Sequence, residues 1–146
     1  MQLSKFTDYG LRVLMHLVAV SPDKVSVNRI SEVFDISEHH VAKVASQLVK
    51  GGFVSSGRGR AGGLTLAQDP KLISIGAVVR HLSGDVPVAE CFNTAGCDCR
   101  VFEQCGLRGP LYEAQKAFFA VLDKYTLETV VKERSLLREL LEPNCS

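Results

Sequence analysis

Two short helical segments joined by a tight connection are the feature that most constrains the fold of this chain. Ser26 is placed to cap a helix that runs through Phe34, and Ser37 is placed to cap a second helix over 38–50. The second helix carries an apolar stripe and is followed by Gly51-Gly52, which is typical of a helix end. Two helices with this connection predict a helix-turn-helix motif. The stripe consists of Val41, Val44, Ala45 and Leu48.

A glycine-rich turn between two short apolar runs follows the second helix. The runs 53–56 and 64–66 flank the segment GRGRAGG, which predicts a β-hairpin. GRGRAG also matches the dinucleotide fingerprint G-x-G-x-x-G, but that fingerprint requires a following helix and a strand is expected here, so we reject it. The helices and hairpin together predict a mainly α fold, a winged helix-turn-helix with a small β-hairpin wing. Glycines permit a tight wing tip, from which Arg58, Arg60 and Gly62 are expected to contact DNA.

Charge is distributed unevenly along a chain whose net charge is only +1. Residues 40–67 contain no acid, whereas Lys43, Lys50 and the two wing arginines are basic. A basic face on a near-neutral protein is typical of a small DNA-binding domain, because only the docking surface meets phosphates. The first turns of the second helix are the part that enters the major groove. The DNA contacts predicted there are Ser37, Glu38, His39, His40 and Lys43.

Further helices are expected outside this motif. Apolar spacing predicts helices over 6–19 and 73–82, a long helix after Pro110, and a shorter helical segment over 127–141. The long helix is so apolar along one face that we expect it to pack against a copy of itself in a homodimer. The dimer contacts predicted on that face are Leu111, Phe118, Val121, Leu122 and Tyr125.

The length of 146 residues suits a small domain with an oligomerising appendage. We divide it into a DNA-binding domain (1–70), a connecting helix with a cysteine loop (71–106) and a dimerisation helix with a C-terminal segment (107–146). The chain starts without an apolar signal segment and has no stretch near the roughly 20 apolar residues of a membrane span, so a cytoplasmic location with no membrane partner is expected. No nucleophile–base pair, phosphate loop or paired carboxylates stand out, so no enzyme is expected.

Four cysteines lie within the fifteen residues CFNTAGCDCRVFEQC, which span 91–105. Thiols at this density suggest a loop that holds a soft metal or an iron–sulfur cluster. Disulfides fit poorly, because the total of five cysteines is odd and a reducing cytosol is expected. Zinc fits less well, since paired Cys-x2-Cys arrangements are absent. A metal-free thiol redox switch that uses Cys97 and Cys99 stays open as an alternative.

The opening FTDYGLR, the helix-turn-helix, the RGRAGG wing and a cysteine loop before a long helix resemble the winged-helix iron–sulfur repressor family over roughly 1–141. This family includes nitric-oxide-sensing, iron-responsive and cluster-biogenesis regulators. The resemblance implies a homodimeric transcriptional repressor that binds an inverted-repeat operator in double-stranded DNA. It also implies an iron–sulfur cluster, expected to be 4Fe–4S, with 2Fe–2S as the alternative.

The resemblance implies a set of cluster ligands as well. Family members use three cysteines, and the common spacing of the last two matches Cys99 and Cys105, with Cys91 as the first. The alternative set has Cys97 in place of Cys99. Arg108 stands where the cluster-biogenesis regulators have a histidine, which disfavours that branch.

Asp8, within FTDYGLR, corresponds to an aspartate that in nitric-oxide regulators ligates the cluster from the partner subunit. Iron holds a carboxylate weakly, so such a ligand leaves easily and opens a site for nitric oxide. The resemblance therefore favours nitric oxide as the signal, with iron as the alternative. Arg12 lies four residues further along the helix and is expected to orient Asp8 or offset an anionic cluster. The plainer interpretation is that the two residues only form a helical ion pair.

Overall fold

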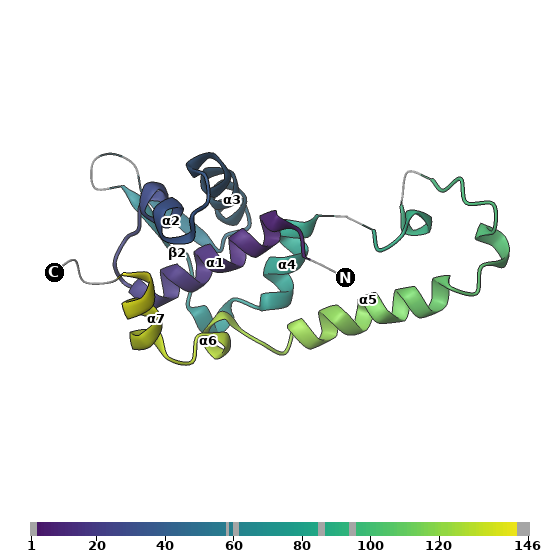
Figure 1. Ribbon diagram of the computed structural model, residues 1–146. Helices are drawn as coiled ribbons and strands as arrows, with labels where there is room; N and C mark the ends of the chain where they lie inside the picture. The colour runs from purple at the N-terminus through teal and green to yellow at the C-terminus, as the bar shows by residue number, and fades with distance from the viewer. Residues whose placement is uncertain (1–2, 58, 60–61, 85–86, 94–95, 143–146) are drawn as a thin grey trace.

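The structure is a computed structural model that describes residues 3–57, 59, 62–84, 87–93 and 96–142 (Figure 1). Arg58 and Arg60, two of the predicted wing contacts, and Cys145 lie outside the described residues. The principal elements are α1 (Lys5–Val20), α2 (Val27–Phe34), α3 (Glu38–Lys50), β1 (Val54–Gly57), β2 (Gly63–Leu66), α4 (Ile75–Ser83), α5 (Arg108–Leu122), α6 (Leu127–Val130) and α7 (Arg134–Leu141).

Helix α1 lies at the centre of the fold, and α3, α4 and α7 pack against it. Its apolar face, which includes Val13, Leu14 and Leu17, is buried at the middle of the core. Gly10 lets α1 approach α4 closely, since a Cβ at this position would collide with Leu82. The amphipathic helix predicted at this end of the chain is thus the element around which the others assemble.

The helix-turn-helix prediction is confirmed. Ser26 caps α2 by accepting a hydrogen bond from the Arg29 backbone N–H at 3.1 Å, and Ser37 caps α3 by accepting from His40 N–H at 3.3 Å. The connection turns at Asp35, whose φ of 50° is left-handed, and then buries Ile36. All four residues of the predicted apolar stripe of α3 are buried.

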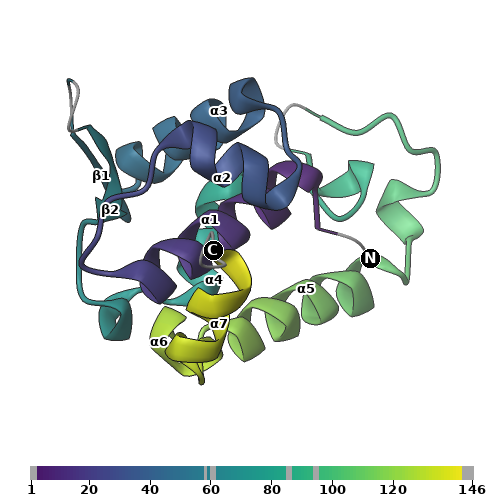
Figure 2. The same ribbon diagram turned by 60° about the vertical axis from the view of Figure 1, so that its left-hand side comes forward.

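Strands β1 and β2 form the predicted hairpin wing. They pair antiparallel, from Val54 opposite Leu66 to Gly57 opposite Gly63. Val25, just before α2, bridges to Leu64 through two backbone hydrogen bonds of 3.1 and 2.8 Å, which ties the wing to the helix-turn-helix. Figure 2 shows the hairpin extending from the helical body. The fold is therefore mainly α with a two-stranded wing, as expected.

Helix α5 extends away from the helical body, and its C-terminal end lies nearest to α4 (Figure 1). Every residue of α5 is described and none of them is buried within the chain. The helix begins two residues before Pro110, which its first turn tolerates because N–H groups there lack helical partners. The connection from α4 to α5 contains the four clustered cysteines.

The expectation of a single helical segment over 127–141 is wrong. The chain forms two helices, α6 and α7, separated by residues 131–133. The break lets Arg134 donate through Nε and Nη2 to the Val18 carbonyl at 3.0 and 2.7 Å, so that α7 turns back along α1. No helix in the described part of the chain is long and apolar enough to cross a membrane.

Candidate functional site

The five DNA contacts predicted at the start of the second helix all lie at the exposed N-terminal end of α3. Ser37, Glu38, His39, His40 and Lys43 are exposed. Two contacts from neighbouring helices orient this end of α3. Asn28 of α2 donates through Nδ2 to Glu38 Oε1 at 3.0 Å, and the Tyr9 ring of α1 lies 6.3 Å from that of His40. The structure thus brings the predicted contacts together on one exposed helix end.

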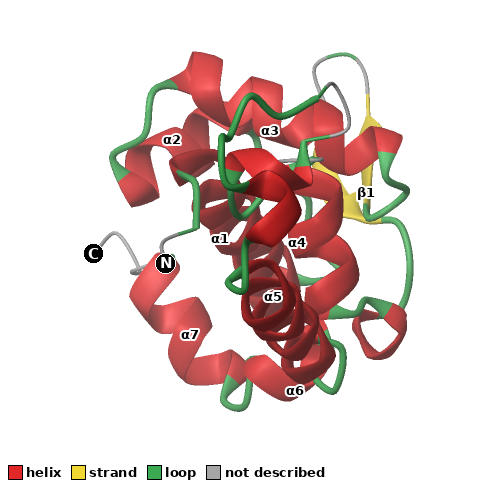
Figure 3. Cartoon of the chain, turned by 90° about the vertical axis from the view of Figure 1, so that its right-hand side faces the viewer, coloured by secondary structure: helices red, strands yellow, loops and turns green. Residues whose placement is uncertain are grey.

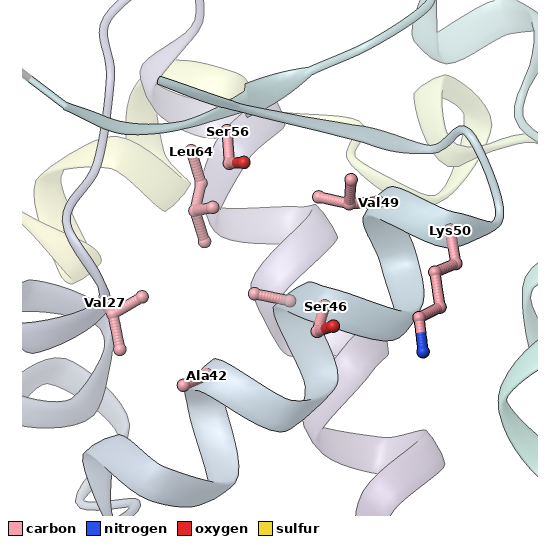
Figure 4. Close-up of a pocket in the computed structure, with 8 residues that line it drawn as sticks. Val27, Ala42, Ser46, Val49, Lys50, Ser56 and Leu64 are labelled. Carbon is pink, nitrogen blue, oxygen red and sulfur yellow. The ribbon is translucent and has the colours of Figure 1, made fainter. Parts of the chain in front are cut away.

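A pocket of ≈ 350 Å³ lies between α3 and the wing (Figure 4). Ser46 and Lys50 line it from α3, and Ser56 lines it from β1. The rest of its lining is apolar and consists of Val27, Ala42, Ala45, Val49 and Leu64, so the polar groups are confined to these three residues. Sequence reasoning missed the two serines. The available signal was the spacing of Ala42, Ser46 and Lys50, which places them on a face of α3 away from its buried stripe.

The wing tip is only partly described. Gly62 donates its backbone N–H to the Gly59 carbonyl at 2.8 Å, and Gly59 has a φ of 86° that favours glycine. The predicted contact residue Gly62 therefore lies in the turn of the hairpin. The predictions for Arg58 and Arg60 fall outside the described residues.

The cysteine loop carries four free thiols, Cys91, Cys97, Cys99 and Cys105. Cys99 is exposed and the other three are half-buried. The described backbone hydrogen bonds of the loop are local, such as Phe102 N–H to Cys99 O at 3.1 Å and Asn93 N–H to Glu90 O at 2.9 Å. The loop is therefore a set of short turns.

The thiols do not converge on one point within a single chain. In the described ranges, no three side chains of histidine, cysteine, aspartate or glutamate are grouped so that they could hold a metal ion. The Cys99 backbone N–H contacts Cys97 Sγ at 3.4 Å, which is the one cysteine–cysteine bond that the described hydrogen bonds include. The predicted ligands thus share a loop without forming a site by themselves.

The chemistry of this loop nevertheless fits an anionic iron–sulfur cluster. Thiolates are the usual ligands of such clusters. Arg108, at the end of the loop, has a buried Nε without a hydrogen-bond partner among the described residues, and its guanidinium lies 4.1 Å from the centre of the Phe102 ring. A buried cationic donor that lacks an acceptor suits a site that receives negative charge. Sequence reasoning considered Arg108 only as a replacement for a histidine.

Asp8 and Arg12 form the helical ion pair, with Arg12 Nη2 2.8 Å from Asp8 Oδ2 and both side chains half-exposed. Thr7, the residue before Asp8, has its Oγ1 3.3 Å from Ser83 Oγ at the end of α4, from which the chain continues toward the cysteines. The chain therefore contains the helical ion pair that the plainer interpretation predicts. The exposure of Asp8 leaves its carboxylate accessible to a second subunit.

The fold and the exposed recognition helix define a winged helix-turn-helix DNA-binding protein. Residues 3–133 match the Rrf2 family, described as an iron-dependent transcriptional regulator. The HTH-type transcriptional regulator NsrR of Geobacillus kaustophilus (strain HTA426) is 43% identical over 143 residues, which are 97% of each chain. Its counterpart in Bacillus subtilis (strain 168) is also 43% identical, over 97% of this chain and 98% of its own length. The chain therefore belongs to the Rrf2 family of transcriptional regulators.

Solved structures agree with this assignment. CymR (YrzC), the global cysteine regulator of B. subtilis, matches 90% of this chain and 96% of its own with a TM-score of 0.69 and 27% identity. IscR of T. potens matches 90% of this chain and 87% of its own with a TM-score of 0.71 and 26% identity. Because the relatives are transcriptional regulators, this chain is a regulator and not an enzyme.

Proposed function

We propose that this regulator is a cytoplasmic, homodimeric repressor whose affinity for an inverted-repeat operator depends on an iron–sulfur cluster. The observation that carries the proposal is a loop of four free thiols that leads directly from α4, in the DNA-binding body, into the exposed helix α5. The family's description as iron-dependent supports an iron-containing group. The resemblance noted in the sequence favours 4Fe–4S.

DNA recognition is assigned to the exposed end of α3 and to the wing. Glu38 can accept a hydrogen bond from a cytosine amino group, and Lys43 suits a guanine edge or a phosphate. A two-fold symmetric dimer presents two such helices, so the operator is expected to be an inverted repeat with half-sites about one helical turn apart.

Dimerisation is assigned to α5. Val121 of α5 is 51% exposed in the single chain. Tyr125 was predicted on the same helix face, but α5 ends at Leu122, so Tyr125 lies beyond the helix and is 48% exposed. Leu111, Phe118 and Leu122 are half-buried, and the last two pack partly against the core of their own chain. An apolar helix face with this exposure favours a partner helix, because association removes apolar surface from water.

Cys91, Cys99 and Cys105 are the proposed cysteine ligands, with Cys97 as a spare thiol, and Asp8 of the partner subunit is the proposed fourth ligand. When bound, the cluster supplies irons that react with small diatomic molecules such as nitric oxide. Arg108, at the end of the loop, and Arg12, which pairs with Asp8, are the residues proposed to offset its negative charge. The loop that carries these thiols joins α4 to α5, so a change at the cluster would act on both helices.

The FTDYGLR segment with its exposed Asp8 supports nitric oxide as the signal. Iron availability is the second candidate signal, which the family description as iron-dependent favours. The two signals make different demands. A nitric-oxide sensor has to retain its cluster until the gas arrives, whereas an iron sensor has to lose the cluster when iron becomes scarce.

The visible absorption spectrum of anaerobically purified protein tests the proposal. One sample is titrated with nitric oxide and a parallel sample receives an iron chelator. A broad iron–sulfur band that bleaches with nitric oxide and resists the chelator supports the nitric-oxide sensor. A band that the chelator removes readily favours the iron-responsive repressor. A colourless protein with full DNA affinity contradicts the cluster proposal.

A further inference from the structure

Two adjacent residues of α4 reach in different directions, one to the recognition helix and one to the exposed helix α5. His81 donates through Nε2 to the Gln47 carbonyl of α3 at 2.7 Å, and its ring meets that of Phe53 edge-on at 5.6 Å. Arg80 donates through Nη1 and Nη2 to the two carboxylate oxygens of Asp123, at 2.7 and 2.6 Å. Helix α4 therefore holds α3 on one side and the end of α5 on the other.

The contact of Arg80 with Asp123, which forms the joint between α4 and α5, fixes the direction of α5 relative to α4 as well as the distance between the two helices. A two-pronged bond between a guanidinium and a carboxylate restricts rotation, because both groups are planar. The Arg80 guanidinium also lies 4.6 Å from the centre of the Phe119 ring. Gly76 completes the joint, since a Cβ there would collide with Asp123. The hydrogen bond from Arg80 holds the pKa of the Asp123 carboxyl below its usual range, so the pair stays charged.

The backbone continues this joint beyond α5. Ile75 N–H donates to the Tyr125 carbonyl at 3.0 Å, and Leu127 N–H donates to the Ile73 carbonyl at 2.8 Å. These bonds attach the segment after α5 to the start of α4. Since no residue of α5 is buried within the chain, its direction is set at this one end. Figure 3, in which α5 points toward the viewer, shows it leaving the body beside α4 and α6.

The joint between α4 and α3 is equally close. A Cβ at Gly51, at the end of α3, would lie 2.8 Å from His81 Nε2 and 2.7 Å from the Phe53 ring. The space is therefore too small for a methyl group, and α3 cannot shift along α4 without breaking the hydrogen bond from His81. Two tight joints on neighbouring residues make α4 a rigid connection.

We propose that Arg80 and His81 are positioning residues that fix the separation of the two recognition helices in the dimer, and so set the half-site spacing that the protein accepts. This inference rests on the proposed homodimer through α5. If α5 pairs with its copy, one route from that pair to α3 runs through α4 and these two joints, beside the packing of α3 and α4 on α1. Loosening either joint lets α3 move relative to the dimer axis, so a wider range of spacings should bind.

Selection from a pool of random-sequence DNA duplexes tests this, because it needs no known operator. The full-length, anaerobically purified wild type is compared with Arg80→Gln and His81→Phe. The wild type is expected to enrich inverted repeats with a single half-site spacing, whereas both variants enrich repeats with several spacings. In direct binding measurements, the preference of wild type for its own spacing over one base pair more or less should fall roughly five-fold or more in each variant.

Arg138→Gln is the matched control. It removes an exposed arginine–aspartate pair, to Asp23 at 2.6 Å, that joins α7 to the loop after α1 and lies outside the proposed route. It should keep the wild-type spacing. Arg80→Lys, which retains the charge without the two-pronged bond, provides a second variant if Arg80→Gln fails to fold. Variants at Arg80 that select the single wild-type spacing overturn the inference. A wild type that enriches no inverted repeat overturns the proposed homodimeric function itself.

Discussion

At the scale of residues, the question is which thiols would hold the proposed cluster, because the loop offers four and the proposed site uses three. Cys97 and Cys99 compete for one ligand position. Cys99 is exposed, whereas Cys97 is half-buried and accepts a weak contact from the Cys99 backbone N–H at 3.4 Å. Exposure does not separate the two, because the proposed ligands Cys91 and Cys105 are half-buried as well; the spacing to Cys105 that the family resemblance implies favours Cys99.

Replacing these two thiols separately gives the first prediction. Cys99→Ala should abolish the cluster, because it removes one of three thiolate ligands, whereas Cys97→Ala should retain it. Iron and sulfide content per subunit, measured after anaerobic purification, checks this. Cys91→Ala and Cys105→Ala serve as controls that should both lose iron. If Cys97→Ala loses its iron and Cys99→Ala retains it, Cys97 is the ligand and Cys99 is the spare thiol.

Asp8 carries the second prediction at this scale. Asp8→Ala should leave a cluster-bearing protein whose reaction with nitric oxide has altered kinetics, since a weakly held carboxylate ligand is lost. Stopped-flow absorption during mixing with nitric oxide measures the change. Glu32→Ala is the matched control, because it also removes a carboxylate that pairs with an arginine along one helix, Arg29 at 3.5 Å. Kinetics equal to wild type in both variants would leave Asp8 as a helical ion pair only.

At the scale of helices, a partly buried cluster of three polar side chains connects the end of α7 to the DNA-binding body. The fully buried His16 of α1 donates through Nε2 to Glu142 Oε1 at 2.7 Å, and Arg29 of α2 donates to the other carboxylate oxygen at 3.0 Å. His16 Nδ1 is buried and has no hydrogen-bond partner within the described part of the chain. The end of α7 thereby contacts both α1 and the first helix of the helix-turn-helix.

The third prediction follows from the protonation of His16. Burial is the main cause that lowers the pKa of His16, while Glu142 acts in the opposite direction and the nearby Arg29 charge lowers it further. The unfolded chain, with a histidine pKa of about 6.5, therefore takes up this proton first as the pH falls, and the folded state loses stability below that value. Thermal unfolding of wild type and His16→Gln should show a smaller acid-induced decrease in Tm for the variant. Equal decreases would mean that His16 does not cause the effect.

Local sequence signals predicted the helix-turn-helix and missed the arrangement of the C-terminal segment. Ser26, Ser37 and Gly51-Gly52 act on residues within one turn of themselves, so capping chemistry reveals their helix boundaries directly. The break before α7 depends on Arg134 reaching Val18, a contact between residues 116 positions apart. The joint of Arg80 with Asp123 is also long-range. Periodicity cannot reveal such contacts, because it reports only which face of a helix is apolar.

For the whole molecule, α5 is the element through which the proposed homodimer would form. Its apolar residues are half-buried or exposed, and it is attached to the body at its C-terminal end. A monomer would leave this surface in water. A homodimer through α5 would cover it.

The fourth prediction tests this assembly. Val121→Glu places a charge on the predicted contact face and should weaken dimerisation at least about tenfold, because burying an unpaired carboxylate is costly. Sedimentation velocity over a range of concentrations measures the effect. Lys116→Glu introduces the same side chain at an exposed position of α5 away from that face, and it should remain dimeric. Val121→Glu that sediments as a wild-type dimer would place the interface elsewhere.

The most direct test of the central claim is the affinity for DNA in different states of the cysteine loop. Fluorescence anisotropy with an operator obtained by selection gives the Kd of cluster-loaded protein before and after exposure to nitric oxide, with Cys91→Ala as the variant that cannot respond. We predict that nitric oxide weakens wild-type binding by about tenfold or more and leaves the Kd of Cys91→Ala unchanged. The same Kd for wild type before and after nitric oxide, with the cluster bleached, would contradict control of DNA binding by the cluster.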